Sequence, residues 1–199
     1  MIFRLLTFLL IPFFVIAGHS NAQNTAFNLA DDYELIIDGD SNARDWDAKA
    51  TRMEANFVLN GFNGNSLDEL RPEHFNTLEL RIPVGDLDSD SRRLNRNLHN
   101  YLKEDDHPLI TFELQEINSI DSNGSNAAIY ATGRISAAGV SNTVEMEVTT
   151  EINGNGDLIF SGIQPLLMTD FGIEPPSAML GAIRARDEMD IRFTVRFTN

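Results

Sequence analysis

Histidines are the first residues in this sequence that could do chemistry, and three of them, His74, His99 and His107, lie beyond residue 22. No two of the three are four residues apart, so no helix presents a pair of imidazoles to a zinc ion on one face. His99 and His107 could meet at the end of a predicted helix, but a zinc site needs further ligands that the sequence does not place. We interpret both as surface histidines and keep a small catalytic or zinc site there as an alternative.

Carboxylates are the most abundant reactive groups, with 30 Asp and Glu against 15 Lys and Arg. Asp86–Asp90 begins like a calcium-binding loop, but Ser91 replaces the required glycine and Asn97 replaces the bidentate glutamate. We therefore interpret the segment as an acidic turn before a helix. A glycosidase pair could be chosen from so many acids without any specificity. Because the sequence also has no cysteine, no G-x-S-x-G elbow and no phosphate loop, we predict that the protein is not an enzyme and has no catalytic residues, metal or cofactor.

The charge balance narrows the range of partners. A formal net charge of −15 disfavours binding to nucleic acid, because phosphates need clustered cations. The same charge opposes attachment to anionic membranes by electrostatics alone. A hydrophobic content of 42% in 199 residues is enough for one well-buried domain.

The N-terminal segment has the three-part layout of a secretory signal peptide. A weakly positive start precedes Leu5–Ala17, a run of 13 residues that are almost all apolar, and small residues then lead to Ala22. The run is shorter than the roughly 20 apolar residues of a membrane-spanning helix. We expect residues 1–22 to be removed by a cut near Ala22, which would leave residues 23–199 as a single domain in the periplasm or outside the cell.

Beyond this segment, apolar residues alternate with polar ones far more often than they follow a helical period. The clearest case is Met189–Phe197, where every second residue is apolar. Similar runs cover Tyr33–Ile37, Thr51–Leu59, Leu78–Ile82, Ile110–Leu114, Ile129–Ile135 and Val144–Ile152. Asn-Gly pairs follow several of these runs and are typical of tight turns. The pattern predicts an all-β antiparallel sandwich or barrel.

Two segments depart from the alternation. Residues 88–103 predict an amphipathic helix that Asp90 or Ser91 can cap. Its apolar stripe consists of Leu94, Leu98, Tyr101 and Leu102. Residues 164–182 contain a Leu-Leu-Met cluster and two prolines, and we expect them to form a long excursion between the last two strands.

The inward positions of such a sheet are apolar and are the candidate ligand-binding residues. They are Phe57, Leu80, Phe112, Leu114, Met146, Val148, Phe160, Ile191, Phe193 and Val195. Small residues, among them Gly133 and Gly162, are mixed with them, so the interior could close as a core or leave a tunnel for an apolar chain. Trp46, the only tryptophan, is interpreted as a core residue or as a plug at the end of a barrel, with a platform for a ligand as the alternative.

Several motifs, in order along the chain, resemble the YceI-like family of secreted lipid- and polyisoprenoid-binding proteins. They are Gly39–Asn42 with Trp46, Leu98–Lys103 with His107–Phe112, Gly133–Ile135 with Gly139-Val140 and Val144, Phe160–Gly162 with Met168–Ile173, and Pro175-Pro176 with Leu180-Gly181. The resemblance implies a single antiparallel eight-stranded lipocalin-like β-barrel with a minor, amphipathic helix between strands. It also implies a cavity that takes an isoprenoid or another lipid tail. In this arrangement Phe171 would face the barrel and is added to the candidate ligand-binding residues.

The leading hypothesis is therefore a periplasmic or secreted carrier that holds a polyisoprenoid, a quinone precursor or a fatty chain. The alternative is a non-catalytic, stress-related barrel with a filled core that acts through a protein partner. We expect no stable membrane insertion, and a homodimer is compatible with the sequence. Delivery to a membrane would need an apolar lip, for which Leu166–Met168 and Met179–Leu180 are candidates, although both could instead plug the barrel end.

Overall fold

A computed structural model describes residues 24–62, 64 and 66–199 of the chain. The predicted signal peptide, residues 1–22, lies outside these described residues. Within them, no helix combines the length and the apolar character needed to cross a membrane.

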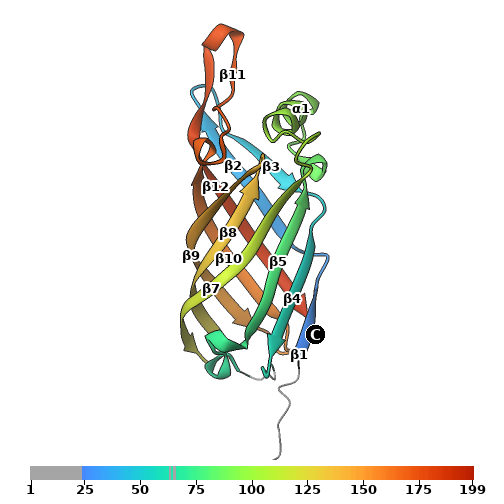
Figure 1. The fold of residues 1–199 in the computed structure, drawn as a ribbon, viewed down its shortest axis with the longest axis vertical. Coiled ribbons are helices and arrows are strands. Elements are labelled where there is room, and N and C mark those ends of the chain that lie inside the picture. The colour runs from blue at the N-terminus through green and yellow to red at the C-terminus, as the bar shows by residue number, and fades with distance from the viewer. Residues whose placement is uncertain (1–23, 63, 65) are drawn as a thin grey trace, which may run out of the picture.

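Eight antiparallel strands form a closed barrel (Figure 1). In order around the ring they are β1 (Asn24–Leu29), β4 (Glu54–Asn60), β5 (Phe75–Pro83), β7 (Leu109–Asn123), β8 (Asn126–Ala137), β9 (Val140–Ile152), β10 (Leu158–Leu167) and β12 (Ile183–Thr198). The ring closes because β12 pairs with β1 at Asn28↔Thr198 and Leu29↔Phe197. The predicted eight-stranded lipocalin-like barrel is confirmed.

Strand β12 is long enough to pair with two different strands along the same edge. Its last residues pair with β1, whereas Ala185–Thr194 pair with β2 (Glu34–Ser41). Strand β2 in turn carries β3 (Trp46–Ala50), and β3 carries the two-residue β6 (Leu87–Asp88). On this side of β12, the wall of the barrel therefore consists of β1 in its lower part and of β2, β3 and β6 in its upper part.

Short helical elements gather at the two ends of the barrel. The only α-helix of the described chain, α1 (Arg92–Tyr101), lies at the upper end with the 3₁₀ turns η3 (Val84–Asp86), η4 (Met168–Phe171) and η5 (Met179–Gly181). The turns η1 (Leu67–Glu69) and η2 (Pro72–His74) lie at the lower end. Helix α1 is shorter than the predicted 88–103 and begins where Ser91 caps it, because the Ser91 Oγ accepts a hydrogen bond from the Leu94 N–H at 3.4 Å.

The predicted start of the excursion was also wrong. The excursion begins after Leu167 and not at Gln164, because β10 stays in register with β12 up to Leu167↔Glu188. Pro165 is tolerated there because the upper part of β10 pairs with β12 but is past its pairing with β9, which ends at Ser161. The excursion itself is a two-stranded arm, in which β11 (Ser177–Ala178) pairs with β12.

Strands β1, β3 and β6 were not predicted. In β3 the inward residues are Ala48 and Ala50, both buried, while Asp47 and Lys49 face outward. Alanine, aspartate and lysine have low strand propensity, so this short strand resembles a loop in the sequence.

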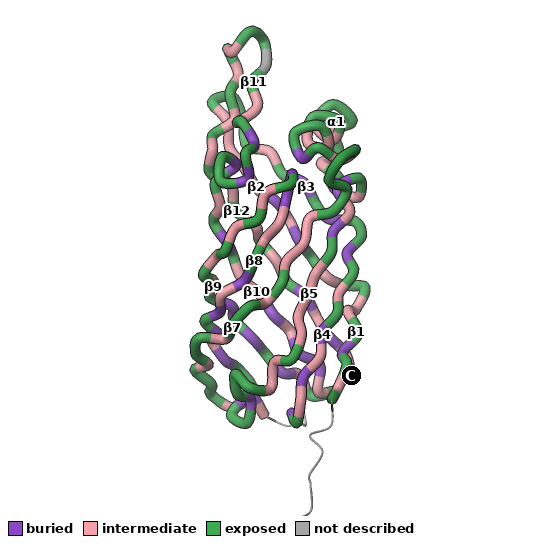
Figure 2. Tube along the Cα trace, in the orientation of Figure 1, coloured by how far each residue is buried: buried purple, intermediate pink, exposed green. Residues whose placement is uncertain are grey.

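The lower half of the barrel is filled by an aromatic cluster, which we call the lower plug. Phe57 is 1% exposed, and its ring lies 4.8–6.2 Å, centroid to centroid, from four other rings. These rings are Phe27, Phe75, Phe160 and Phe197. Buried aliphatic side chains of Leu59, Ile129 and Leu158 complete the layer, and buried residues are dense in this part of the tube in Figure 2. The plug makes the lower half a solid core.

Candidate functional site

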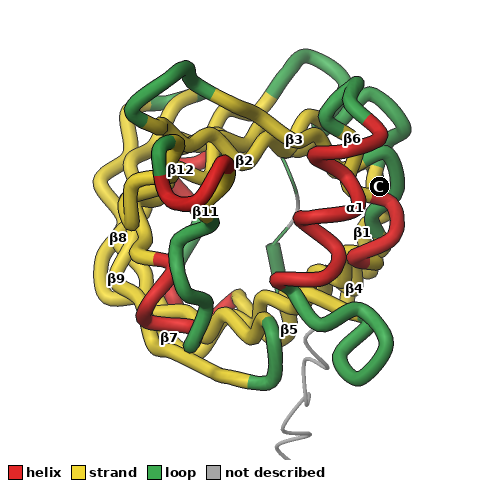
Figure 3. Tube along the Cα trace, turned by 90° about the horizontal axis from the view of Figure 1, so that it is seen from above, coloured by secondary structure: helices red, strands yellow, loops and turns green. Residues whose placement is uncertain are grey.

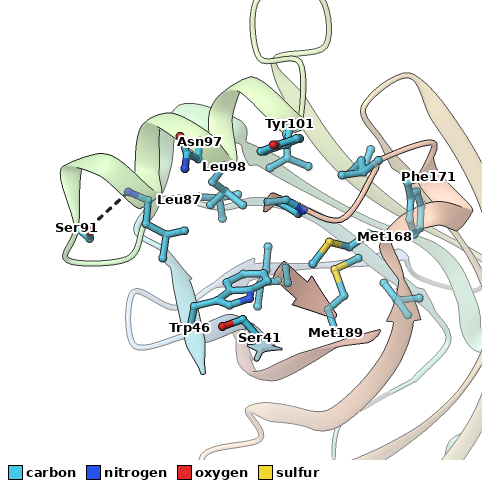
Figure 4. A pocket seen from close by; sticks show the side chains of 18 of the residues that line it. Ser41, Trp46, Leu87, Ser91, Asn97, Leu98, Tyr101, Met168, Phe171 and Met189 are labelled. Carbon is cyan, nitrogen blue, oxygen red and sulfur yellow. Dashed lines mark hydrogen bonds between the residues drawn. The ribbon is translucent and has the colours of Figure 1, made fainter. Parts of the chain in front are cut away.

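The upper half of the barrel contains a cavity of about 530 Å³, which we call the upper pocket. Its walls come from β2, β3, the upper ends of β5, β7, β8, β10 and β12, helix α1 and the excursion after β10. Most of the lining is aliphatic, aromatic or thioether, as in Leu87, Leu98, Phe171, Met168 and Met189 (Figure 4). This volume lies within the range of pockets that bind small organic ligands.

Trp46 forms one wall of the upper pocket, and Gly39 decides its position. The two residues are direct partners across β2 and β3. A Cβ added at Gly39 would lie 2.2 Å from Cζ2 of Trp46, so the indole lies flat against the glycine backbone. The ring therefore lines the pocket and leaves its space open, which corresponds to the alternative of a ligand platform more closely than to a core residue or plug.

Helix α1 covers one side of the barrel end, and the arm around β11 stands on the other side (Figures 1 and 3). The helix turns the stripe of Leu94, Leu98, Tyr101 and Leu102 toward the pocket. The stripe was predicted as a helical face, but its contact with a ligand site was not. Its amphipathic period was the available signal, since an apolar helix face beside a barrel must pack against the barrel's open end.

Two sets of hydrogen bonds hold α1 over the pocket. At its start, Asn95 Nδ2 donates to Asp88 Oδ1 at 2.7 Å, and the Ser89 N–H donates to Asn95 Oδ1 at 2.9 Å. The Asn95 amide, followed by the Asp90 N–H, lowers the pKa of Asp88 below the usual carboxyl value of 3.8. Beyond its end, Lys103 Nζ donates to the carbonyl of Ala138 at 3.2 Å.

The histidines have structural partners. His99 Nε2 lies 3.2 Å from the carbonyl oxygen of Leu87, and its Nδ1 lies 3.2 Å from a carboxylate oxygen of Glu104. His107 packs on Gly139, where an added Cβ would lie 2.4 Å from Nε2. His74 Nδ1 accepts the Arg71 N–H at 3.1 Å. Among residues 24–62, 64 and 66–199, no three His, Cys, Asp or Glu side chains are grouped to hold a metal ion.

The segment after β10 forms the wall opposite Trp46. Met168, Phe171 and Ile173 line the pocket and are buried. Gly172 adopts a left-handed conformation (φ 65°), which ends the 3₁₀ turn and lets Phe171 and Ile173 both point inward. The Asn142 side chain donates to the carbonyl of Asp170 at 2.6 Å and ties this wall to β9.

The candidate ligand-binding residues from the sequence fall into three layers along the barrel axis. Phe171 and Ile191 line the upper pocket. Half-buried residues at mid-height form the second layer: Leu80, Phe112, Leu114, Met146 and Phe193. Buried residues of the lower half form the third: Phe57, Val148, Phe160 and Val195. The structure therefore brings two of the eleven to the pocket, and the role of the others toward a ligand stays a prediction.

A second hollow, of about 470 Å³, lies at the lower end. It is lined by Phe27 and Phe62 and by the polar turn Asn153–Gly156. The lower plug separates it from the upper pocket, so the apolar space of the barrel is reached from the upper end.

Comparison with known proteins identifies solved structures that have a similar fold. The structure is similar to Burkholderia cenocepacia BcnA, with 17% sequence identity, a TM-score of 0.63 and coverage of 83% of this chain and 96% of that one. It is also similar to a polyisoprenoid-binding domain from Saccharophagus degradans implicated in plant cell wall breakdown, with 8% identity, a TM-score of 0.60 and coverage of 88% and 98%.

A third similar structure is a Campylobacter jejuni YceI protein, with 14% identity, a TM-score of 0.55 and coverage of 97% and 91%. At these identities the three structures speak for the fold alone. None of the curated proteins compared with the chain matches it. The family model of the YceI-like domain matches residues 34–197, which contain seven of the eight barrel strands and the whole upper pocket, and the chain therefore belongs to the YceI-like domain family.

Proposed function

We propose that this protein binds an apolar, chain-like lipid in the upper pocket and shields it from water during carriage or storage. The observation that carries the proposal is an apolar-walled cavity of about 530 Å³ above a solid lower plug. Each methylene transferred from water to such a lining contributes about 0.8 kcal/mol, so a chain of modest length binds without any polar contact.

The composition of the lining favours binding over catalysis. The ionisable side chains that line the pocket are Arg44, Arg93 and Tyr101, and the lining residues of the described chain include no carboxylate and no histidine. General acid–base chemistry needs a group that exchanges protons near neutral pH. Histidine and the carboxylates, which most often take this role, are absent from the lining of the described chain.

The class of ligand is supported by family membership. A polyisoprenoid is what the Saccharophagus domain is described as binding, and a branched isoprenoid chain suits the mixture of aliphatic, aromatic and thioether side chains in this pocket. A quinone precursor or a fatty chain has the same apolar character. We further propose, from the layout of residues 1–22, that the protein acts in the periplasm or outside the cell.

The test is organic extraction of the protein, purified without detergent from the compartment in which it accumulates, followed by mass spectrometry. We expect one apolar chain per protein molecule. N-terminal sequencing of the same sample tests export, with a start near Gln23 expected. An empty extract together with failure to bind added polyprenyl lipids would contradict the carrier and favour a barrel that acts through a protein partner.

A pocket-filling variant assigns the bound lipid to the cavity. Met189→Trp adds an indole to the pocket lining and should abolish the extracted lipid. Ile163→Trp is the matched control, because Ile163 is 60% exposed on the outer face of β10. Equal lipid content in both variants would show that the lipid is not held in the pocket.

A further inference from the structure

Two arginines line the mouth of the upper pocket from different elements. Arg44 lies in the loop between β2 and β3, and Arg93 lies in the first turn of α1. Both are exposed, and the lining around them includes the polar side chains of Ser41, Ser91 and Asn97. The pocket therefore changes from apolar in its depth to cationic and polar at its mouth.

These arginines differ from the arginines on the barrel wall, most of which are neutralised by carboxylates. The paired ones are Arg52, Arg81, Arg134, Arg186, Arg192 and Arg196. Arg44 and Arg93, by contrast, form no ion pair and no side-chain hydrogen bond with any other residue that the structure describes. Arg92 and Arg96 on α1 also have no carboxylate partner among the described residues, so the distinguishing feature of Arg44 and Arg93 is that they are the two arginines that line the pocket.

The acids next to Arg44 are engaged elsewhere. Asp40 forms an ion pair with Arg186, with 2.7 Å between Nε and Oδ2. A hydrogen bond with Asp40, and then the charge of Asp40, raises the pKa of Asp45. Thus the carboxyl groups of this loop interact with each other and with Arg186, and the Arg44 guanidinium keeps its charge available to a ligand.

We infer that the upper pocket binds amphiphiles whose head is an anionic oxygen group, a carboxylate or a phosphate monoester, and that Arg44 and Arg93 hold this head at the mouth. This inference rests on the proposed function and names the class of its ligand. A planar guanidinium donates two parallel hydrogen bonds to carboxylate or phosphate oxygens. The chain of the ligand would then extend past Trp46 into the apolar depth.

The experiment compares matched pairs of lipids that differ only in the head. Binding of dodecanoate and dodecanol, and of farnesyl phosphate and farnesol, is measured with the full-length protein by displacement of an apolar fluorescent probe. We expect the wild type to bind at least one anionic member about tenfold or more tightly than its neutral partner, because charge-assisted hydrogen bonds are stronger than neutral ones. The pair with the larger ratio identifies the head as carboxylate or phosphate.

The double variant Arg44→Gln/Arg93→Gln should lose this preference, because its affinity for each anionic lipid falls to about that for the neutral partner. The control is Arg92→Gln/Arg96→Gln, which removes the same charge from α1 at positions outside the pocket lining. Its preference should remain.

The outcomes separate the two proposals. Neutral and anionic lipids bound equally by the wild type, or an equal loss of preference in both double variants, would overturn the headgroup site and leave the carrier intact. A wild type that binds none of the four lipids would contradict the carrier itself, and the headgroup site with it.

Discussion

The lower plug and the upper pocket are built from the same ring of strands with the same alternation, yet one is solid and the other hollow. In the plug, aromatic rings from β1, β4, β5, β10 and β12 meet across the lumen around Phe57. In the pocket the inward residues are mostly aliphatic, and the largest ring of the wall, the Trp46 indole, lies on Gly39. The size of the inward side chain and the residue opposite it decide whether a barrel closes or stays open.

Glycines that lie beneath aromatic rings contribute to this difference between the two halves. At mid-height an added Cβ at Gly133 would lie 2.2 Å from Phe112, and one at Gly162 would lie 2.9 Å from Phe193. Each ring covers the backbone of its glycine, as Trp46 covers Gly39. An aromatic ring that lies along the wall occupies less of the lumen than one that points at the axis, so aromatic-on-glycine pairs line the barrel above the plug.

The largest expected effect is on the plug. Phe57→Ala removes the ring at the centre of four aromatic contacts and should lower the free energy of unfolding by about 3–5 kcal/mol, measured by urea denaturation. Met189→Ala in the pocket wall should cost less, because the Met189 side chain borders empty space. Equal losses would mean that the two halves do not differ in packing.

Closing the pocket from its wall is the next effect in size. Gly39→Val places a branched side chain where the Trp46 indole lies, so the ring must move into the pocket; we expect a loss of about 1–3 kcal/mol of stability and loss of lipid binding. Gly154→Ala is the matched control, since an added Cβ there meets no atom within 4 Å, and should change stability by less than about 0.5 kcal/mol. Retained lipid binding in the Gly39 variant would refute the role of this glycine.

A smaller and opposite effect is expected at Thr150. This residue is 0% exposed in the lower half, and its Oγ1 has no hydrogen-bond partner. Thr150→Val should therefore raise the free energy of unfolding by about 1 kcal/mol, because an unsatisfied buried hydroxyl is replaced by a methyl group of similar size. Thr132→Val, which removes a hydroxyl that donates to Asn118 at 3.1 Å on the outer face, should not stabilise the protein. A destabilised Thr150 variant would show that this part of the core is not dry.

The smallest effect is a pH dependence at the pocket's cover. The lowered pKa of Asp88 means that its stabilising bond to Asn95 is fully present above the ordinary carboxyl value of 3.8 and is lost as the pH falls through the lower folded value. We expect the amide protons of α1, corrected for intrinsic exchange rates, to lose protection below this value while those of β4 do not. Asp88→Asn should remove this pH dependence. If the α1 amides of that variant still lose protection at low pH, another group must cause the pH dependence.

The alternation of apolar residues predicted which side chains face inward, but not their height in the barrel. Phe57 and Ile191 have the same alternating context, yet one lies in the plug and the other in the pocket. Height depends on the register between neighbouring strands, such as Leu80↔Phe112 and Gly162↔Phe193. A single sequence carries no signal for that register, so the candidate residues spread over the whole barrel.

The cap of α1 could be predicted because it depends on a local hydrogen bond between Ser91 and Leu94. The two arginines at the mouth could not be selected in the same way. Arg44 and Arg93 are far apart in the sequence, and other arginines are more numerous; only the fold shows that these two line the pocket.

Because the lower end of the barrel is closed, the pocket has a single opening and a fixed depth. That depth limits the length of lipid chain that the pocket can hold. A chain that enters past Trp46 advances until it meets the aromatic rings below, and any further carbons must remain outside the mouth in water. Affinity should therefore rise with each added methylene or isoprene unit until the pocket is full and then level off. In this barrel the packing of Phe57 and its neighbours, far from any headgroup, would set the length of lipid that the protein retains.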